Sequence, residues 1–172
     1  MEEEPMTIRS HSVADLPGTI REMPVPTTPL LARALPHVSW SDAFAVAVPA
    51  GQQVHEAQVW ADAIFRESPP GWVRVLFAVR EVIVRAVGIE PGHPTVFDTV
   101  ERRHDEVLLG TDQRHLGFRA SVLVEPGRVV VTTVVEVHNR RGSIYSAVVR
   151  RLHPMVVRSM LARAAQKMAV RA

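Results

Sequence analysis

The chain contains no cysteine. It therefore forms no disulfide, binds no metal through thiolates and has no cysteine nucleophile. It also lacks any run of about 18 or more uncharged apolar residues, so we expect no membrane-spanning helix. The N-terminus, MEEEPMTIRS, is acidic where a secretory signal would be basic and then apolar, which leads us to expect a cytoplasmic protein.

Motifs of several enzyme classes are missing as well. The sequence has no glycine-rich phosphate loop and no G-x-S-x-G elbow, which argues against nucleotide cofactors and against serine hydrolysis. Its histidines show neither H-x-x-x-H nor H-E-x-x-H spacing, and carboxylates do not accompany them in ligand patterns. We therefore expect neither a metal ion nor a cofactor.

Acidic residues are absent from the last part of the chain. Glu136 is the last of them, and the charged residues beyond it are all basic, namely Arg140, Arg141, Arg150, Arg151, Arg158, Arg163, Lys167 and Arg171. These side chains form either the solvated face of a packed helix or a basic surface for peripheral contact with an anionic membrane or a partner. The chain shows no nucleic-acid-binding motif, so nucleic acid is not an expected partner.

The chain does contain enough apolar sequence for one core. Its 172 residues suit a single domain, and 47% of them are hydrophobic. Residues 1–36 hold six of the 13 prolines and show no helical or alternating period, which predicts an extended arm. Leu30, Leu31 and Leu35 would allow this arm to lie across the domain. We expect residues 37–172 to form the domain itself.

The periodicity of apolar residues predicts the order of elements in this domain. Residues 42–48 alternate and predict a first strand, and helical spacing predicts helices over 54–65 and 72–87. A period of two then returns and predicts strands over 96–102, 106–110, 115–125 and 129–139, the last two joined by a turn at Pro126-Gly127.

A long helix is predicted after Gly142. Its apolar stripe follows spacings of three and four residues and consists of Tyr145, Val149, Leu152, Val156, Met160 and Ala164. Because this stripe cannot remain in water, we expect it to pack on the sheet. The predicted fold is α+β with a helix-grip layout, in which a curved antiparallel sheet wraps around the long C-terminal helix and two shorter helices follow the first strand.

Two runs in the second half of the chain match a known pattern. They are TDQRHLGFRASV, residues 111–122, and TTVVEVHNRRGSIYSAVVRRLHPMVVRSML, residues 132–161. They resemble the D-x-R-H-L-D-F-R and T-x-V-x-x-H-N-x-x-G-x-x-Y runs of a bacterial domain-of-unknown-function family in the START-like (SRPBCC, Bet v-like) superfamily. The resemblance covers roughly residues 41–165. It implies a helix-grip fold with an internal cavity, in a superfamily of lipid carriers, steroid and hormone binders, and aromatase or cyclase enzymes.

The chain departs from that family pattern at three places. Gly117 stands where the first run usually has an acidic residue, so the role of that carboxylate is missing or has moved. The usual P-F-H run appears as RLHP over residues 151–154, which leaves the correspondence of His153 open. The usual glycine-arginine pair before the tyrosine appears as Gly142-Ser143, which removes one guanidinium.

Polar residues on two predicted strands are the candidates for chemistry. Alternation places His115 and Arg119 on one face of their strand. That face is either solvated or turned into a cavity, where an imidazole and a guanidinium would bind a carboxylate, enolate or phenolate. Thr133, on the apolar face of the next strand, needs a polar partner, and a ligand is one option. His138 and Asn139 either join a site at the strand–helix corner or bond to the backbone there.

Aromatic residues are the candidates for the walls of a cavity. Tyr145 lies on the helical stripe, where its ring is buried and its hydroxyl must reach a polar group. Trp60 and Trp72 fall on the helices that would cover the mouth of the grip, and Phe118 belongs to the apolar face of its strand.

Three functions are open for this sequence. The first is a binding protein that encloses a small, mostly apolar molecule, with polar contacts from Tyr145, Thr133, Arg119 and His115. The second is a cyclase, dehydratase or isomerase acting on a polyketide-like or other apolar substrate, with His115 or His138 as acid or base and Arg119 stabilising negative charge. The third is a partner-binding module that acts through the basic C-terminal helix.

Overall fold

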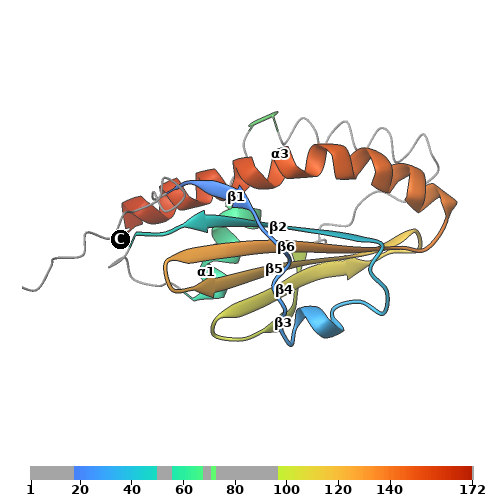
Figure 1. The fold of residues 1–172 in the computed structure, drawn as a ribbon, viewed down its shortest axis with the longest axis horizontal. Coiled ribbons are helices and arrows are strands. Elements are labelled where there is room, and N and C mark those ends of the chain that lie inside the picture. Colours follow the sequence, from blue (N-terminus) through green and yellow to red (C-terminus); the bar gives the residue numbers. More distant parts are fainter. Residues whose placement is uncertain (1–17, 50–55, 68–70, 73–96, 172) are drawn as a thin grey trace, which may run out of the picture.

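The sheet has six antiparallel strands in the order β1-β2-β6-β5-β4-β3, and the long helix α3 lies over one face of it (Figure 1). The computed structural model describes residues 18–49, 56–67, 71–72 and 97–171. The strands are β1 (Ile20–Glu22), β2 (Trp40–Ala47), β3 (Thr99–Arg102), β4 (Glu106–Asp112), β5 (Leu116–Glu125) and β6 (Arg128–Val137). The helical elements are the 3-10 helix η2 (Leu31–Arg33), α1 (Ala57–Ala61), the π-helical turn η3 (Asp62–Arg66) and α3 (Arg140–Arg171). This architecture confirms the predicted α+β fold and its helix-grip layout.

The predicted strands appear as β2 to β6 with shifted ends. Strand β3 begins only at Thr99 and is irregular before Glu101. Strands β5 and β6 form a hairpin, and Gly127 in its turn takes a φ of +79°, which glycine adopts without steric cost. The structure adds β1 and η2 within the proline-rich segment, where composition alone predicted only an extended arm.

The helix predicted over 54–65 corresponds to α1 followed by η3. Residues 54 and 55, and all but the first residue of the helix predicted over 72–87, lie outside the described residues. Within the part of the chain that the structure describes, no helix combines the length and the apolar character needed to cross a membrane.

Helix α3 turns a stripe toward the sheet that only partly matches the predicted one. Tyr145 and Val149 face the sheet and Met160 and Ala164 are buried, as predicted, but Leu152 is 36% exposed and Val156 is only half-buried. The residues of α3 that are buried are Gly142, Ser146, Val157, Met160, Leu161, Ala164 and Met168. The prediction was wrong at Leu152 and Val156 because it followed the apolar residues, whereas the stripe that faces the sheet also includes the polar residues Ser146 and His153.

The main core lies between α3, α1 and one face of the sheet, here called the inner face. Alternate residues of four strands supply its floor, namely Phe44, Val46, Val107, Leu109, Val122, Val129 and Val131. Trp60 and Ile64 pack into this core from α1 and η3, and Leu161 packs into it from α3. Because successive side chains of a strand point to opposite faces, half of the side chains of each strand lie on the opposite face of the sheet. That face needs a separate cover to exclude water.

The opposite face, here called the outer face, is covered by the segment between β1 and β2 (Figure 1). Leu30 is fully buried there and packs with Leu108 and Val134. Met23 packs on a second outer-face cluster, which consists of Ala43, Ala45, Leu123 and Val130. Strands β5 and β6 are therefore buried on both faces, and burial does not alternate along them.

A buried carboxylate ties this segment to the sheet. Glu106 is 2% exposed and accepts hydrogen bonds from the hydroxyls of Thr28 at 2.9 Å and Ser121 at 2.6 Å. The Thr28 hydroxyl in turn accepts a hydrogen bond from the backbone N–H of Leu31 at 3.1 Å. One threonine thus fixes the start of η2 over the outer face, and both of its hydrogen-bonding functions are used.

We expect Leu30→Ala to lower the free energy of unfolding by about 2–4 kcal/mol, because it removes a fully buried leucine and leaves a cavity. Val38→Ala is the matched control, since Val38 belongs to the same segment but is 52% exposed. Urea denaturation measures both variants. Equal, small effects of the two substitutions would show that the segment does not unfold together with the sheet.

Candidate functional site

A close contact between the first turn of α3 and the residue before β5 fixes one end of the inner face. Helix α3 begins at Arg140, so Gly142 lies in its first turn and not in the turn before it. A Cβ atom added to Gly142 would overlap the carbonyl oxygen of His115. Asn139 caps the helix, since its Oδ1 accepts a hydrogen bond from the backbone N–H of Gly142 at 3.0 Å. Its amide nitrogen donates to the carbonyl of Arg114 at 3.0 Å.

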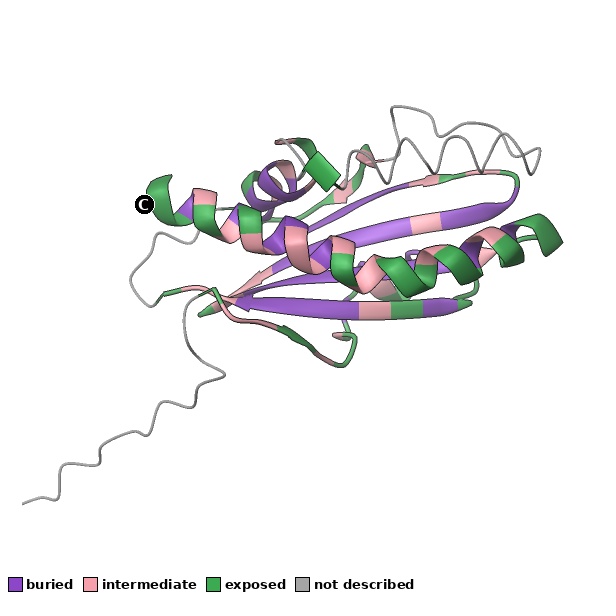
Figure 2. Ribbon diagram, turned by 90° about the horizontal axis from the view of Figure 1, so that it is seen from above, coloured by how far each residue is buried: buried purple, intermediate pink, exposed green. Residues whose placement is uncertain are grey.

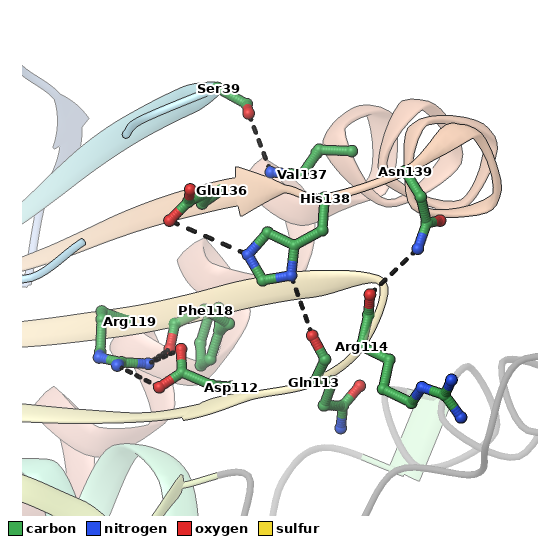
Figure 3. A network of polar contacts seen from close by, with 10 residues as sticks. All are labelled: Ser39, Asp112, Gln113, Arg114, Phe118, Arg119, Glu136, Val137, His138 and Asn139. Atoms are coloured by element: carbon green, nitrogen blue, oxygen red, sulfur yellow. Dashed lines mark hydrogen bonds and ion pairs between the residues drawn. The ribbon is translucent and has the colours of Figure 1, made fainter. Parts of the chain in front are cut away.

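His138 bonds mainly to the backbone at this corner (Figure 3). Its Nδ1 lies 3.1 Å from the carbonyl oxygen of Gln113, and its backbone N–H donates to the carbonyl of His115 at 3.0 Å. Its Nε2 lies 3.9 Å from a carboxylate oxygen of Glu136. Of the two interpretations of the His138-Asn139 pair, the geometry matches the one in which both residues tie down the backbone.

His115 and Arg119 do not share a face, although alternation predicted that they would. Strand β5 begins at Leu116, so alternation does not extend back to His115. The ring of His115 packs edge-on against the ring of Tyr145 on α3, with centroids 5.8 Å apart. The two side chains that the sequence proposed as a joint anion-binding pair are therefore separated by the sheet.

Arg119 lies on the outer face and is bound there to a carboxylate. Its two terminal nitrogens donate to the carboxylate oxygens of Asp112 at 3.0 and 2.7 Å, and one also donates to the carbonyl of Phe118 (Figure 3). The Arg119 hydrogen bonds hold the pKa of the Asp112 carboxyl below its usual value. Asp112 is paired across the strands with Gly117, so a carboxylate does stand beside the position where the family pattern has one.

A second polar cluster lies on the inner face, between the sheet and α3. The imidazole Nδ1 of His153 lies 2.8 Å from Oδ2 of Asp42, and its Nε2 lies 3.4 Å from the hydroxyl oxygen of Thr133. Asp42 of β2 and Thr133 of β6 are direct cross-strand partners. Three segments that are distant in the sequence thus contribute one residue each to a line from carboxylate to imidazole to hydroxyl.

Trp40 packs against this cluster and is itself held by a hydrogen bond to α3. The ring of Trp40 packs edge-on against the imidazole of His153 with centroids 5.4 Å apart, and its N–H donates to the hydroxyl of Ser146 at 2.6 Å. The other carboxylate oxygen of Asp42, Oδ1, is buried and has no hydrogen-bond partner within the described residues. A buried carboxylate oxygen without a partner is costly, because it has lost its hydration without replacement.

The half of α3 above this cluster is less tightly packed than its other half (Figure 2). From Val157 to Met168 the residues facing the sheet are buried in the main core. Tyr145, Val149 and His153 face the sheet nearer to the start of the helix but are only half-buried. Phe118 and Val137 on the facing strands are also half-buried. An apolar zone of incomplete burial therefore lies beside the inner-face cluster, toward the start of α3.

The three aromatic residues predicted to line a cavity, Trp60, Trp72 and Phe118, lie in three different environments. Trp60 is 3% exposed and belongs to the main core. Trp72 is 39% exposed, which leaves it at the surface. Phe118 belongs to the half-buried zone and packs edge-on against Phe97, with ring centroids 5.9 Å apart. Of these three, only Phe118 lies beside the inner-face cluster.

The basic residues of α3 are partly engaged within the chain. Arg158 donates to the carbonyl of Ile20 at 3.4 Å and lies over the ring of Phe44, while Lys167 and Arg171 both contact Glu67. Arg171 holds the pKa of the Glu67 carboxyl below its usual value by a side-chain hydrogen bond. The exposed basic residues include Arg140, Arg150, Arg151 and Arg163.

No described group of three or more histidine, aspartate or glutamate side chains is placed to hold a metal ion.

Sequence reasoning identified Thr133 but missed its two partners. Asp42 lies between Trp40 and Phe44 on the same face of β2, because side chains two residues apart share a face. A carboxylate between two large apolar side chains was the signal in the sequence that could have identified Asp42. His153 was not among the candidate residues, and its correspondence to the family's P-F-H run stayed open. His153 lies seven residues after Ser146 and four residues before Val157, which places it on the buried stripe of α3. The sequence does not reveal which residues form that stripe, so this spacing could not identify His153 in advance.

We expect Gly142→Ala to lower the free energy of unfolding by about 2 kcal/mol or more, because the added methyl group would overlap the His115 carbonyl. Without that contact alanine would instead stabilise a helix by about 1 kcal/mol, so the sign of the effect is decisive. Gly71→Ala is the control, since no atom of the described residues lies within 4 Å of a Cβ added there. Urea denaturation gives both values, and a stabilised Gly142→Ala variant would refute the close contact.

We expect Asp112→Asn to lower stability at neutral pH by about 1 kcal/mol or less, since it leaves the buried Arg119 guanidinium without its carboxylate while Asp112 itself is mostly exposed. Because the folded-state pKa of Asp112 is lowered, its contribution is complete above the unfolded value of about 4 and is lost as pH falls through the folded value. Urea midpoints of wild type and variant should therefore converge in acid. Asp105→Asn, at an exposed position, is the control, and a difference that does not shrink in acid would contradict this account.

Comparison with known proteins gives one match. Residues 34–160 match the family described as protein of unknown function (DUF2867). No curated protein and no solved structure matches the chain. The matched range includes Asp42, Thr133 and His153, together with the corner around Gly142. Because it spans well over half of the sequence, the chain belongs to the DUF2867 family of proteins of unknown function.

Proposed function

We propose that this protein binds a small, mostly apolar molecule between the inner face of the sheet and the first half of α3. The helix-grip layout supports this proposal, since the helix and sheet meet there through side chains that are incompletely buried. The resemblance to the START-like superfamily, which contains carriers of lipids and steroids, supports it as well. Small-molecule sites are typically apolar with a few placed polar groups, which is the composition of this zone.

The observation that carries the proposal is the buried carboxylate oxygen Oδ1 of Asp42, which has no hydrogen-bond partner among the described residues. Buried polar atoms in proteins nearly always have a partner, so an unpaired one at the edge of a half-buried apolar zone points to a ligand. A carboxylate only accepts hydrogen bonds. The molecule should therefore carry at least one hydroxyl or amine that donates to Asp42.

Half-buried apolar side chains supply the rest of the proposed site. Phe118 and Val137 face it from the sheet, and Tyr145 and Val149 face it from α3. Tyr145 brings a hydroxyl into this zone, and Thr133 brings a second one from the sheet. Arg119 and His138, which the sequence also suggested, lie on the outer face or at the corner and are not part of the proposed site.

Native mass spectrometry of the freshly purified protein, followed by denaturing extraction, tests whether a molecule accompanies the chain. Titration with the neutral apolar dye N-phenyl-1-naphthylamine gives an affinity that does not depend on the natural ligand. We expect Val149→Trp to weaken dye binding by about tenfold or more, because the indole would fill the half-buried zone.

Val148→Trp is the matched control for this experiment. The substitution is the same and the position is adjacent, but Val148 is 48% exposed on the outward side of α3. Circular dichroism establishes that both variants are folded, and Val149→Phe provides a smaller step if the tryptophan disrupts packing. Equal dye affinities for the folded Val149→Trp and Val148→Trp variants would place the binding elsewhere and defeat the proposal.

A further inference from the structure

We propose that Asp42, His153 and Thr133 form a proton-transfer site acting on a small apolar carbonyl compound, an inference that rests on the binding function proposed above. It replaces His115, His138 and Arg119 as the residues that would carry acid–base chemistry. His115 packs on Tyr145, His138 bonds to the corner backbone, and Arg119 faces away from α3.

The first step of the argument is the tautomer of His153. A carboxylate can only accept, so the 2.8 Å contact with Asp42 places a hydrogen atom on Nδ1 of His153. In the neutral imidazole, Nε2 then carries a free electron pair. The Thr133 hydroxyl, at 3.4 Å, is a distant partner for that nitrogen, so a substrate atom can take its place with little loss.

The second step concerns how the imidazole is held. His153 is fixed by Asp42 on one side and by the ring of Trp40 on another, and Trp40 is itself anchored by Ser146. The His153 side chain is 14% exposed and lies beside the half-buried zone. An oriented base next to an apolar binding surface is the arrangement that proton abstraction requires.

The reaction follows from these positions without any cofactor. The Nε2 electron pair takes a proton from the carbon next to the substrate carbonyl, the C–H electron pair forms a C=C bond, and the C=O π pair moves to oxygen. The products of this step are an enolate and the His153 imidazolium. Protonated Nε2 no longer accepts from Thr133, whose hydroxyl is then free to donate to the enolate oxygen. In a substrate with a double bond between its β and γ carbons, that bond is conjugated with the enolate. Return of the proton from Nε2 to the γ carbon then moves the double bond to the α and β carbons, restores the carbonyl and gives an isomer of the substrate.

The roles of the three residues differ. His153 is the catalytic base, because its Nε2 would touch the reacting hydrogen. Thr133 is a hydrogen-bond donor to the developing charge. Asp42 acts through His153 and is a positioning residue. Its Oδ2 orients the imidazole, while its Oδ1 accepts from the substrate.

The test uses 5-nitrobenzisoxazole, a flat, neutral, mostly apolar probe. A base removes its ring C–H proton, the C–H electron pair forms the C≡N bond, and the N–O bond breaks to give the coloured 2-cyano-4-nitrophenolate. We expect the wild-type protein to accelerate this reaction, and His153→Gln to lower kcat/KM by about 100-fold. We expect Asp42→Asn to lower kcat by about tenfold while KM changes by less than about twofold.

His138→Gln is the matched control, because it removes one of the two histidines that the sequence offered as acid or base while leaving the inner face intact. Dye affinity measured on each variant separates binding from chemistry. If the wild type binds the dye but does not accelerate the reaction, or if the rate falls with His138→Gln and not with His153→Gln, the proton-transfer site is refuted. If neither dye nor probe binds, the proposed binding function fails instead.

Nitrogen-15 NMR of the wild-type imidazoles provides a second test that needs no variant to be folded. We expect the neutral imidazole of His153 to carry its hydrogen on Nδ1 and a free electron pair on Nε2. A hydrogen on Nε2 with Nδ1 unprotonated would leave no base facing the site and would overturn the inference.

Discussion

The position of α3 over the sheet depends on how closely its first turn approaches the start of β5. Only glycine allows that approach, because any side chain at position 142 would overlap the carbonyl of His115. The same carbonyl accepts the N–H of His138, and Asn139 caps the helix that follows. These contacts fix where α3 begins and how it is rotated. Ser146 and His153, spaced by four and eleven residues from Gly142, consequently face the sheet.

Burial of the sheet on both faces explains why the charged side chains buried on its outer face are paired locally. The segment between β1 and β2 covers the outer face, where Glu106 is bound by two hydroxyls and Arg119 by Asp112. Burying a charge without a partner costs several kcal/mol, so each of these groups has a nearby partner. These interactions hold the covering segment and the strands together. The polar residues Arg119 and Ser121 of β5 are thus explained by partners within the chain, and neither requires a ligand.

The inner face differs, since its polar cluster lies where packing is least complete. A stabilising role alone would favour apolar residues at positions 42, 133 and 153, because replacing a buried polar group by a well-packed apolar one is often neutral or stabilising. The cluster instead keeps an oriented imidazole and an unpaired carboxylate oxygen beside half-buried aromatic and aliphatic side chains. Interactions retained at a cost to stability are most common at functional sites.

The candidate site was only partly predictable, and the residues show why. Thr133 could be found because a hydroxyl on an apolar strand face needs a partner, and Tyr145 because it follows the helical period. Asp42 and His153 could not be connected, because they are 111 residues apart and meet only through the pairing of β2 with β6 and the rotation of α3. His115 was placed on the same face as Arg119 because alternation was extended back beyond the start of the strand at Leu116.

The sequence by itself determined the type and order of strands β2 to β6 and of the long helix α3. Valine- and threonine-rich runs with a period of two form strands, Pro126-Gly127 forms the hairpin turn, and the apolar spacing after residue 142 forms a long helix. These signals are local, so each can be recognised within a short window. The tertiary structure alone decided which side of α3 faces the sheet, which segment covers the outer face and which polar side chains meet. Those outcomes depend on contacts between distant residues, above all the approach of Gly142 to His115, and no local period encodes them.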